Sequence, residues 1–191
     1  MRRGIVFLVI FGIWVSMIHG AEAEERDDFR HTMTLFKKME SRTKVPWYYF
    51  AAINQYEKNL RNTREDLPDA KDPVAVYFSQ RKWVGLMNPD YNDKNPVTIE
   101  LYGGIGLDGN HDGRVERNNL KDVLYTLGNY LKSFGLNEED IKIALWERYQ
   151  RGETIAIIMG YAKIYKKFNK LKLDKNAFPL PLEANYTINN T

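Results

Sequence analysis

Residues 108–113 read Asp108-Gly109-Asn110-His111-Asp112-Gly113. Side chains that carry oxygen atoms stand at alternate positions of this stretch, and a glycine follows them. In a tight loop, side chains at such positions converge on one point, where a hard cation such as Ca²⁺ takes about six to eight oxygen ligands. The stretch therefore predicts a calcium-binding loop.

The loop resembles an EF-hand loop, in which Asp108, Asn110 and Asp112 would bind calcium through their side chains. Arg114 would contribute its backbone carbonyl. An EF-hand closes with a glutamate at the twelfth position, which is Asn119 in this chain. The loop thus departs from the pattern at its closing ligand, and a turn rich in Asp and Gly that binds no metal is the alternative.

The first 23 residues have the features of a secretory signal. Arg2 and Arg3 precede an apolar run over 5–18, and small residues flank position 22. We expect cleavage before Glu24, which would leave a secreted or cell-wall protein without a membrane segment. The apolar run is short for a bilayer span, although an uncleaved anchor is the alternative.

The composition excludes several classes of function. The chain contains no cysteine, so it has no disulfide, thiol catalyst or thiolate metal site. Its formal charge of +3 comes from interspersed acids and bases, which gives no support for nucleic-acid binding. We expect one domain over residues 24–168, a flexible C-terminal tail over 169–191, and a monomer.

Hydrophobic spacing is helical nearly throughout and predicts an all-α fold. The segment 74–78 is too short to assign, and a buried strand and a single helical turn are both compatible with it. The segment 153–168 is apolar nearly all round, which predicts a helix at the centre of the bundle. We expect helices around 29–36, over 46–61, up to Tyr102, over 120–134, after the capping residue Asn137, and over 153–168.

Glu57 is the one carboxylate on the predicted helix over 46–61. Asn54, Ile53 and Phe50 precede it on the same helical face. A partly apolar surrounding disfavours the charged form of a carboxyl group, as a general acid near neutral pH requires. The alternative is a surface glutamate that pairs with Arg61 one helical turn later.

The motif Ala52-Ile53-x-x-x-Glu57 resembles the catalytic helix of lytic transglycosylases in the lysozyme-like superfamily. The segments 85–89 (Gly-Leu-Met-Asn-Pro) and 149–152 (Tyr-Gln-Arg-Gly) resemble two further motifs of these enzymes, in the same order. The resemblance implies that Tyr149 orients Glu57. It also implies that the sugar groove is lined by Met87, Asn88 and Gln150.

Residues 104–122 and 128–131 resemble the membrane-bound lytic transglycosylase B branch, which has a longer calcium loop. That comparison implies structural Ca²⁺ and a closing carboxylate from Asp122. The implied ligands are Asp108, Asn110, Asp112, the Arg114 carbonyl and Asp122. A similar module precedes LytM-type zinc peptidases, but we expect no such peptidase half in this chain, which has only His31 and His111 after the signal.

The resemblance implies a secreted enzyme with a lysozyme-like helical domain that cleaves peptidoglycan glycan strands. Glu57 would protonate the leaving oxygen and then accept a proton from the muramoyl C6 hydroxyl, which gives a 1,6-anhydro product. Lys58, Asn88 and Gln150 depart from the family pattern. They motivate a second hypothesis, a catalytically inactive, calcium-stabilised module that binds peptidoglycan. An EF-hand signalling protein is the third and fits an exported chain poorly.

Overall fold

The computed structural model describes residues 30–63 and 74–169, and no strand occurs among them. The all-α prediction is therefore confirmed for this part of the chain. None of its helices is long and apolar enough to cross a membrane. The predicted signal and the tail beyond residue 169 lie outside the described residues. The helices are 30–43, α2 (Trp47–Thr63), α3 (Gln80–Val84), α4 (Pro96–Leu101), α5 (Leu120–Lys132), α6 (Glu138–Tyr149) and α7 (Gly152–Phe168).

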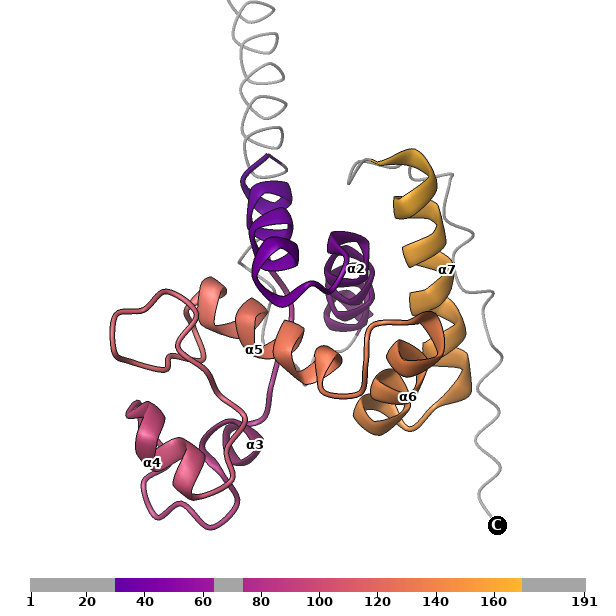
Figure 1. The fold of residues 1–191 in the computed structure, drawn as a ribbon. Coiled ribbons are helices and arrows are strands. Elements are labelled where there is room, and N and C mark those ends of the chain that lie inside the picture. The colour runs from indigo at the N-terminus through magenta and orange to yellow at the C-terminus, as the bar shows by residue number, and fades with distance from the viewer. Residues whose placement is uncertain (1–29, 64–73, 170–191) are drawn as a thin grey trace, which may run out of the picture.

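Helix α2 lies at the centre of the helical bundle. Its most extensive helix contact is with α7, and it also packs against α5, while α6 contacts both α5 and α7 (Figure 1). Phe50 on α2 is completely buried and stacks on Phe36 of the helix 30–43, with ring centroids 6.3 Å apart. Helices α3 and α4 form a smaller lobe with the loop over 103–119 (Figure 1).

The expectation that the helix over 153–168 lies at the centre is wrong. Helix α7 stands at the side of the bundle, and its buried side chains include Ile158, Met159, Ala162 and Tyr165. Ala156, on another face, is exposed. The central position belongs to α2, whose residues 49–54 are all buried. The apolar composition of 153–168 is compatible with a helix that is buried on one face as well as with one that is buried all round, so it did not predict the position of α7.

Capping residues set where the helices begin. The side chain of Asn137 accepts a hydrogen bond from the Asp140 amide, and the Asp140 carboxylate accepts one from the Asn137 amide. This reciprocal pair stabilises the first turn of α6, as the sequence predicts. Asn119 caps α5 by accepting from the Lys121 amide at 3.0 Å. Its amide group therefore serves the helix start.

The segment 74–79, between α2 and α3, has no regular secondary structure. It buries Val74, Val76 and Phe78, and the Ala75 amide donates to the side-chain oxygen of Asn54 on α2 at 2.5 Å. Tyr77 is the exception, with 41% of its surface exposed. An extended segment thus crosses from the bundle to the small lobe and presents one aromatic ring to solvent.

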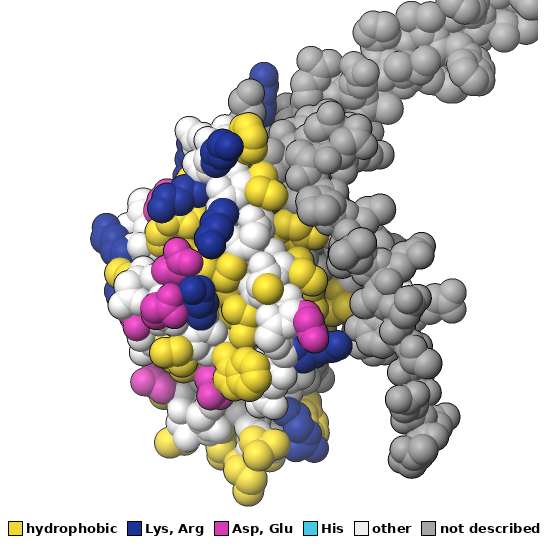
Figure 2. Space-filling model, turned by 90° about the vertical axis from the view of Figure 1, so that its right-hand side faces the viewer, with side chains coloured by type: hydrophobic (Ala, Val, Ile, Leu, Met, Phe, Trp, Pro, Cys, Tyr) yellow, Lys and Arg dark blue, Asp and Glu magenta, His cyan; other side chains and the backbone are white. Residues whose placement is uncertain are grey.

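Charges are mixed on the face of the molecule that carries α7. Figure 2 shows basic and acidic side chains there with apolar ones between them. Lys163, Lys166 and Lys167 are exposed along α7, whereas Glu139 and Glu147 are exposed on the neighbouring α6. This face is therefore no concentrated basic surface.

Two helical glycines give a test of the packing. A Cβ on Gly128 of α5 would lie 2.6 Å from Thr43 Cγ2 and 2.9 Å from Phe50 Cζ, whereas a Cβ on Gly160 of α7 meets nothing within 4 Å. We expect Gly128→Ala to lower the free energy of unfolding by about 1–3 kcal/mol through overpacking. Gly160→Ala should leave it unchanged or raise it by up to about 1 kcal/mol. Urea unfolding followed by circular dichroism measures both, and equal stability of the two variants would contradict the packing.

Candidate functional site

Glu57 lies in a buried cluster between α2 and α6. Its Oε1 accepts a hydrogen bond from Arg148 Nη2 at 3.0 Å and another from Tyr149 Oη at 2.8 Å. Only 10% of the Glu57 side chain and 7% of the Arg148 side chain are exposed. The central carboxylate of the predicted site is thus one half of a buried ion pair.

Arg148 makes contacts beyond the carboxylate. Its Nη2 also donates to the backbone oxygen of Tyr77 at 2.6 Å, and its guanidinium lies 4.5 Å from the centre of the Phe78 ring. The Arg148 Nε is buried and has no hydrogen-bond partner among the described residues. The arginine therefore links α6 to both α2 and the segment 74–79.

Tyr149 is fixed from two sides. Its ring packs edge-on against Tyr56 with centroids 5.4 Å apart, and the Tyr56 hydroxyl is 2.9 Å from Thr154 Oγ1. Burial raises the pKa of Tyr149 well above its ordinary value, because the phenolate form loses its hydration. The Tyr149 hydroxyl therefore stays protonated and donates to Glu57.

The carboxylate of Glu57 is engaged within the protein. One of its oxygens accepts from both a guanidinium and a phenol, and hydrogen bonds that involve a charged group are the stronger ones. The alternative pairing of Glu57 with Arg61 is wrong, because Arg61 lies 5.6 Å from the centre of the Tyr77 ring and forms no ion pair within the described residues.

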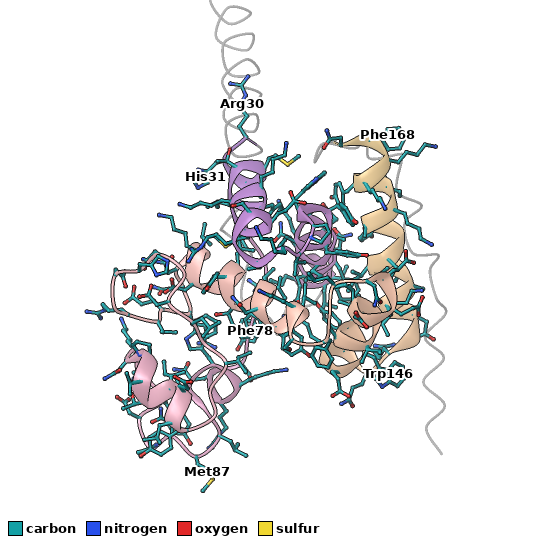
Figure 3. All side chains as sticks on the ribbon, in the orientation of Figure 1. Arg30, His31, Phe78, Met87, Trp146 and Phe168 are labelled. Carbon is teal, nitrogen blue, oxygen red and sulfur yellow. The ribbon has the colours of Figure 1, made fainter. Side chains whose placement is uncertain are left out.

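The structure brings Tyr149 to Glu57, and the three predicted groove residues lie at three different features of the fold. Met87 is 78% exposed at the tip of the small lobe, far from Phe78 in the view of Figure 3. The buried Asn88 side chain organises its own turn: it donates to Val84 O at 3.1 Å and accepts from the Asp90 amide. Gln150 ends α6 in the left-handed region with φ of 50° and is exposed.

The loop at Asp108 is organised around that carboxylate. Asp108 accepts hydrogen bonds from the backbone amides of Asn110, His111 and Gly113 at 3.2, 2.6 and 2.8 Å. Burial raises the pKa of Asp108, but these amides outweigh it and hold the pKa below its ordinary value. Arg42, at the end of the helix 30–43, donates to Gly109 O and lies 2.7 Å from His111 Nε2. The loop is thus attached to the bundle.

Asp122, in the first turn of α5, is completely buried behind this loop. Its two oxygens accept from the amides of Gly109 and Glu116, both at 2.8 Å. Burial raises its pKa above the ordinary value against these two hydrogen bonds, and the negative charges of Asp108 and Asp112 raise it further. Within the described part of the chain, no basic side chain forms an ion pair with Asp122.

The chemistry of the predicted ligand set suits calcium, because every donor is an oxygen. Asn110 and Asp112 are joined directly, since Asn110 Nδ2 donates to Asp112 Oδ2 at 2.7 Å. The amide of Arg114 donates to Asp112 Oδ1 at 2.9 Å. Among residues 30–63 and 74–169, no three Asp, Glu, His or Cys side chains are grouped closely enough to hold a metal ion. An amide oxygen and a backbone carbonyl would have to complete the site.

The chain is 40% identical over 159 residues to the L-Ala–D-Glu endopeptidase of Bacillus subtilis (strain 168). The match covers 83% of this chain and 49% of that protein, so the chain spans about half the length of this relative. No protein-family model matches the chain. No solved structure matches it either, so the lysozyme-like arrangement stays a prediction.

The comparison overturns the expectation of a lytic transglycosylase. The relative acts, by its name, on a peptide bond, whereas a transglycosylase cleaves a glycosidic bond and is a carbon–oxygen lyase. The short motif around Glu57 fits both because a carboxylate on a partly apolar helical face serves a catalytic site and a buried ion pair equally well. The relative is a cell-wall peptidase, so the expected transglycosylase activity is wrong, whereas a catalytic role of Glu57 stays a prediction.

The sequence did not predict Arg148 as the partner of Glu57. This arginine lies 91 positions from Glu57, and no periodic pattern connects residues so far apart. The only local signal is its place directly before Tyr149, in the last turn of α6. A basic residue in that position is ordinarily assigned to the helix terminus.

The buried ion pair predicts a large loss of stability when one partner is neutralised. Glu57→Gln leaves the Arg148 charge buried and uncompensated, which should lower the free energy of unfolding by about 3 kcal/mol. Chemical denaturation measures this loss. Glu147→Gln, at an exposed position beside the same arginine, is the matched control and should change stability by less than about 0.5 kcal/mol. A Glu57→Gln protein as stable as the control would show that the pair contributes nothing.

Proposed function

We propose that this chain acts on cell-wall peptidoglycan as a hydrolase of the L-Ala–D-Glu endopeptidase kind, which cleaves an amide bond. The observation that carries the proposal is the 40% identity over 159 residues. The match omits only 32 of the 191 residues, so it includes most of the helical domain. Action on peptidoglycan implies a location outside the cytoplasmic membrane, which agrees with the predicted signal.

We assign to the helical domain the binding of the peptide part of the substrate. The Glu57–Arg148 pair supports this assignment indirectly, because a buried carboxylate that already accepts from a guanidinium and a phenol stabilises the structure. The extended segment 74–79, which Arg148 holds, presents Tyr77 to solvent. Arg148 thus holds the segment 74–79 in place, and Tyr77 on this segment is accessible to a ligand.

We also propose that the loop over 108–122 binds structural Ca²⁺. The support comes from the oxygen donor set and from Asp122, a fully buried carboxylate whose hydrogen bonds among the described residues come from two backbone amides. A buried charge without an opposite charge is costly, and a cation bound at this loop would reduce that cost. Calcium would then fix the loop to the start of α5.

Purified sacculi test the hydrolase assignment. After incubation with the chain, newly freed amino groups are labelled with fluorodinitrobenzene, and the labelled amino acids are identified by mass spectrometry after acid hydrolysis. We expect labelled glutamate to increase with time, because cleavage of an L-Ala–D-Glu bond frees the glutamate amino group. Heat-denatured chain is the control.

Sedimentation of the same sacculi separates binding from cleavage. The chain should co-sediment with peptidoglycan and should not with cellulose, a polysaccharide without peptides. Co-sedimentation without labelled glutamate would contradict the hydrolase assignment and leave the binding role. Loss of both signals would contradict the whole proposal.

Chelation tests the calcium site. A ligand at about one hundred times its dissociation constant stabilises a protein by about 2.7 kcal/mol. In a chain of this length that corresponds to a rise of about 5–10 °C in the melting temperature. We expect EDTA to lower the melting temperature by this amount, and Asp108→Ala to remove the difference between the two conditions.

Asp90→Ala is the matched control for the calcium prediction. Asp90 accepts from the Asn92 amide at 2.8 Å in a turn of the small lobe, much as Asp108 accepts from Asn110, but it lies outside the predicted ligand set. This variant should keep its response to EDTA. A wild-type melting curve that EDTA does not move would refute the calcium proposal.

A further inference from the structure

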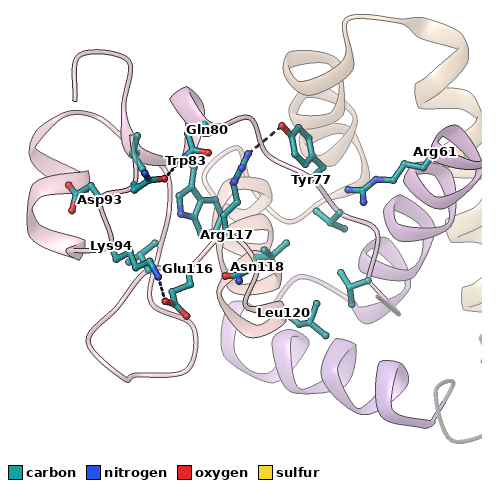
Figure 4. Close-up of a pocket in the computed structure, with 16 residues that line it drawn as sticks. Arg61, Tyr77, Gln80, Trp83, Asp93, Lys94, Glu116, Arg117, Asn118 and Leu120 are labelled. Atoms are coloured by element: carbon teal, nitrogen blue, oxygen red, sulfur yellow. Dashed lines mark hydrogen bonds and ion pairs between the residues drawn. The ribbon is translucent and has the colours of Figure 1, made fainter. Parts of the chain in front are cut away.

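A cavity of about 510 Å³ opens between the bundle and the small lobe (Figure 4). Its walls come from the end of α2, the segment 74–80, the loop over 92–94, and residues 115–123. Tyr77 stands at one side and Trp83 near the middle, as Figure 4 shows. The cavity is large enough for a small peptide or a sugar, since ligand sites begin near about 300 Å³.

Two arginines flank the exposed ring of Tyr77. The guanidinium carbons of Arg61 and Arg117 lie 5.6 Å and 5.4 Å from its centre. Arg117 Nη1 also donates to Phe78 O at 3.0 Å and lies 3.3 Å from the Tyr77 hydroxyl. Neither arginine pairs with an acidic side chain of the described residues. Two positive charges beside one ring, neither of them paired within the described residues, attract an anion.

Trp83 adds a neutral hydrogen-bond donor to the cavity. It is 2% exposed and lines the cavity, and its buried Nε1 has no hydrogen-bond partner among the described residues. A buried donor without a partner is costly, and native proteins rarely leave one. A ligand oxygen would satisfy it. Arg61, Arg117 and Trp83 thus all offer hydrogen-bond donors to a ligand in the cavity.

The opposite side of the cavity carries one ion pair and one carboxylate. Lys94 Nζ pairs with Glu116 at 2.6 Å, and the Asp93 carboxylate accepts from the neutral side chains of Thr98 and Asn88. An anion would accordingly bind away from Asp93, beside Arg61 and Arg117, which form no ion pair within the described residues.

We propose that this cavity binds the glutamate carboxylate of a peptidoglycan peptide, with Arg117 as its charged partner and with Arg61 and Trp83 Nε1 as further donors on the cavity wall for the rest of the peptide. The identification of the ligand rests on the proposed function, since an L-Ala–D-Glu unit carries a carboxylate beside its amide. The planar guanidinium of Arg117 matches a carboxylate with two parallel hydrogen bonds. Tyr77 supplies an apolar face for the alanine methyl group.

Binding of the synthetic dipeptide L-Ala–D-Glu to the full chain tests this site. The ¹⁵N–¹H spectrum reports on it directly, because the indole N–H signal of Trp83 should shift on titration. Trp83→Phe identifies that signal by its loss. We expect Arg117→Gln to weaken binding about tenfold or more, because a hydrogen bond to a charged group is lost. Arg117→Lys should restore part of the affinity.

Matched controls keep the test specific. Arg81→Gln removes another arginine that lies over an exposed tyrosine, 4.8 Å from the Tyr91 ring, but Arg81 does not line the cavity. It should bind the dipeptide as the wild type does. The dipeptide with both carboxyl groups amidated should not bind. Should Arg117→Gln fail to fold, Arg61→Gln provides the same comparison from α2.

Equal affinity of wild type and Arg117→Gln, or equal binding of the amidated dipeptide, would overturn the proposal. These outcomes are independent of the sacculus assay. Dipeptide binding that depends on Arg117, together with sacculi that are neither bound nor cleaved, would leave the carboxylate site standing and refute the proposed function. Cleavage of sacculi, together with dipeptide binding that does not depend on Arg117, would support the proposed function and refute the carboxylate site.

Discussion

The buried ion pair between Glu57 and Arg148 is the interaction on which the arrangement of the molecule depends. It joins α2, at the centre of the bundle, to the end of α6. Through the Tyr77 carbonyl it also fixes the segment that leads to the small lobe. Burying two charges is costly unless their remaining hydrogen-bonding groups find partners, and here Tyr149 and Tyr77 supply most of them. The geometry is therefore strongly specified once the pair forms.

The same interaction determines what reaches the surface. Segment 74–79 has no helical or strand hydrogen bonds of its own, so side chains from both sides hold it. Arg148 binds the carbonyl of Tyr77, Arg117 binds that of Phe78, and Asn54 binds the amide of Ala75. A segment held at three of its six residues has little freedom to move. Tyr77 thus becomes a fixed ring at the edge of the cavity although it lies outside any helix.

The helices were predictable from the sequence because their signals are local. Apolar spacing and the cap at Asn137 depend on residues within a few positions of one another, and the structure contains the corresponding helices. The position of α7 was not predictable, because composition alone does not say which face meets another helix. The partner of Glu57 was not predictable either, since it comes from 91 residues away. The calcium ligands Asp108 and Asp122 stay predictions, although both lie at the loop where the sequence pattern places them.

The arginines of this chain have two different surroundings, one that stabilises the fold and one that suits the binding of a ligand. Arg148 is buried, and an acid of the protein itself compensates its charge. Arg61 and Arg117 stand at a cavity, where solvent makes an uncompensated charge tolerable and a bound anion makes it favourable. A glycan-cleaving site would need a carboxyl group that holds a proton, whereas a peptide substrate brings its own carboxylate and needs donors to receive it. The described charges fit the second requirement, because Glu57 is buried and paired with Arg148, whereas Arg61 and Arg117 form no ion pair within the described residues.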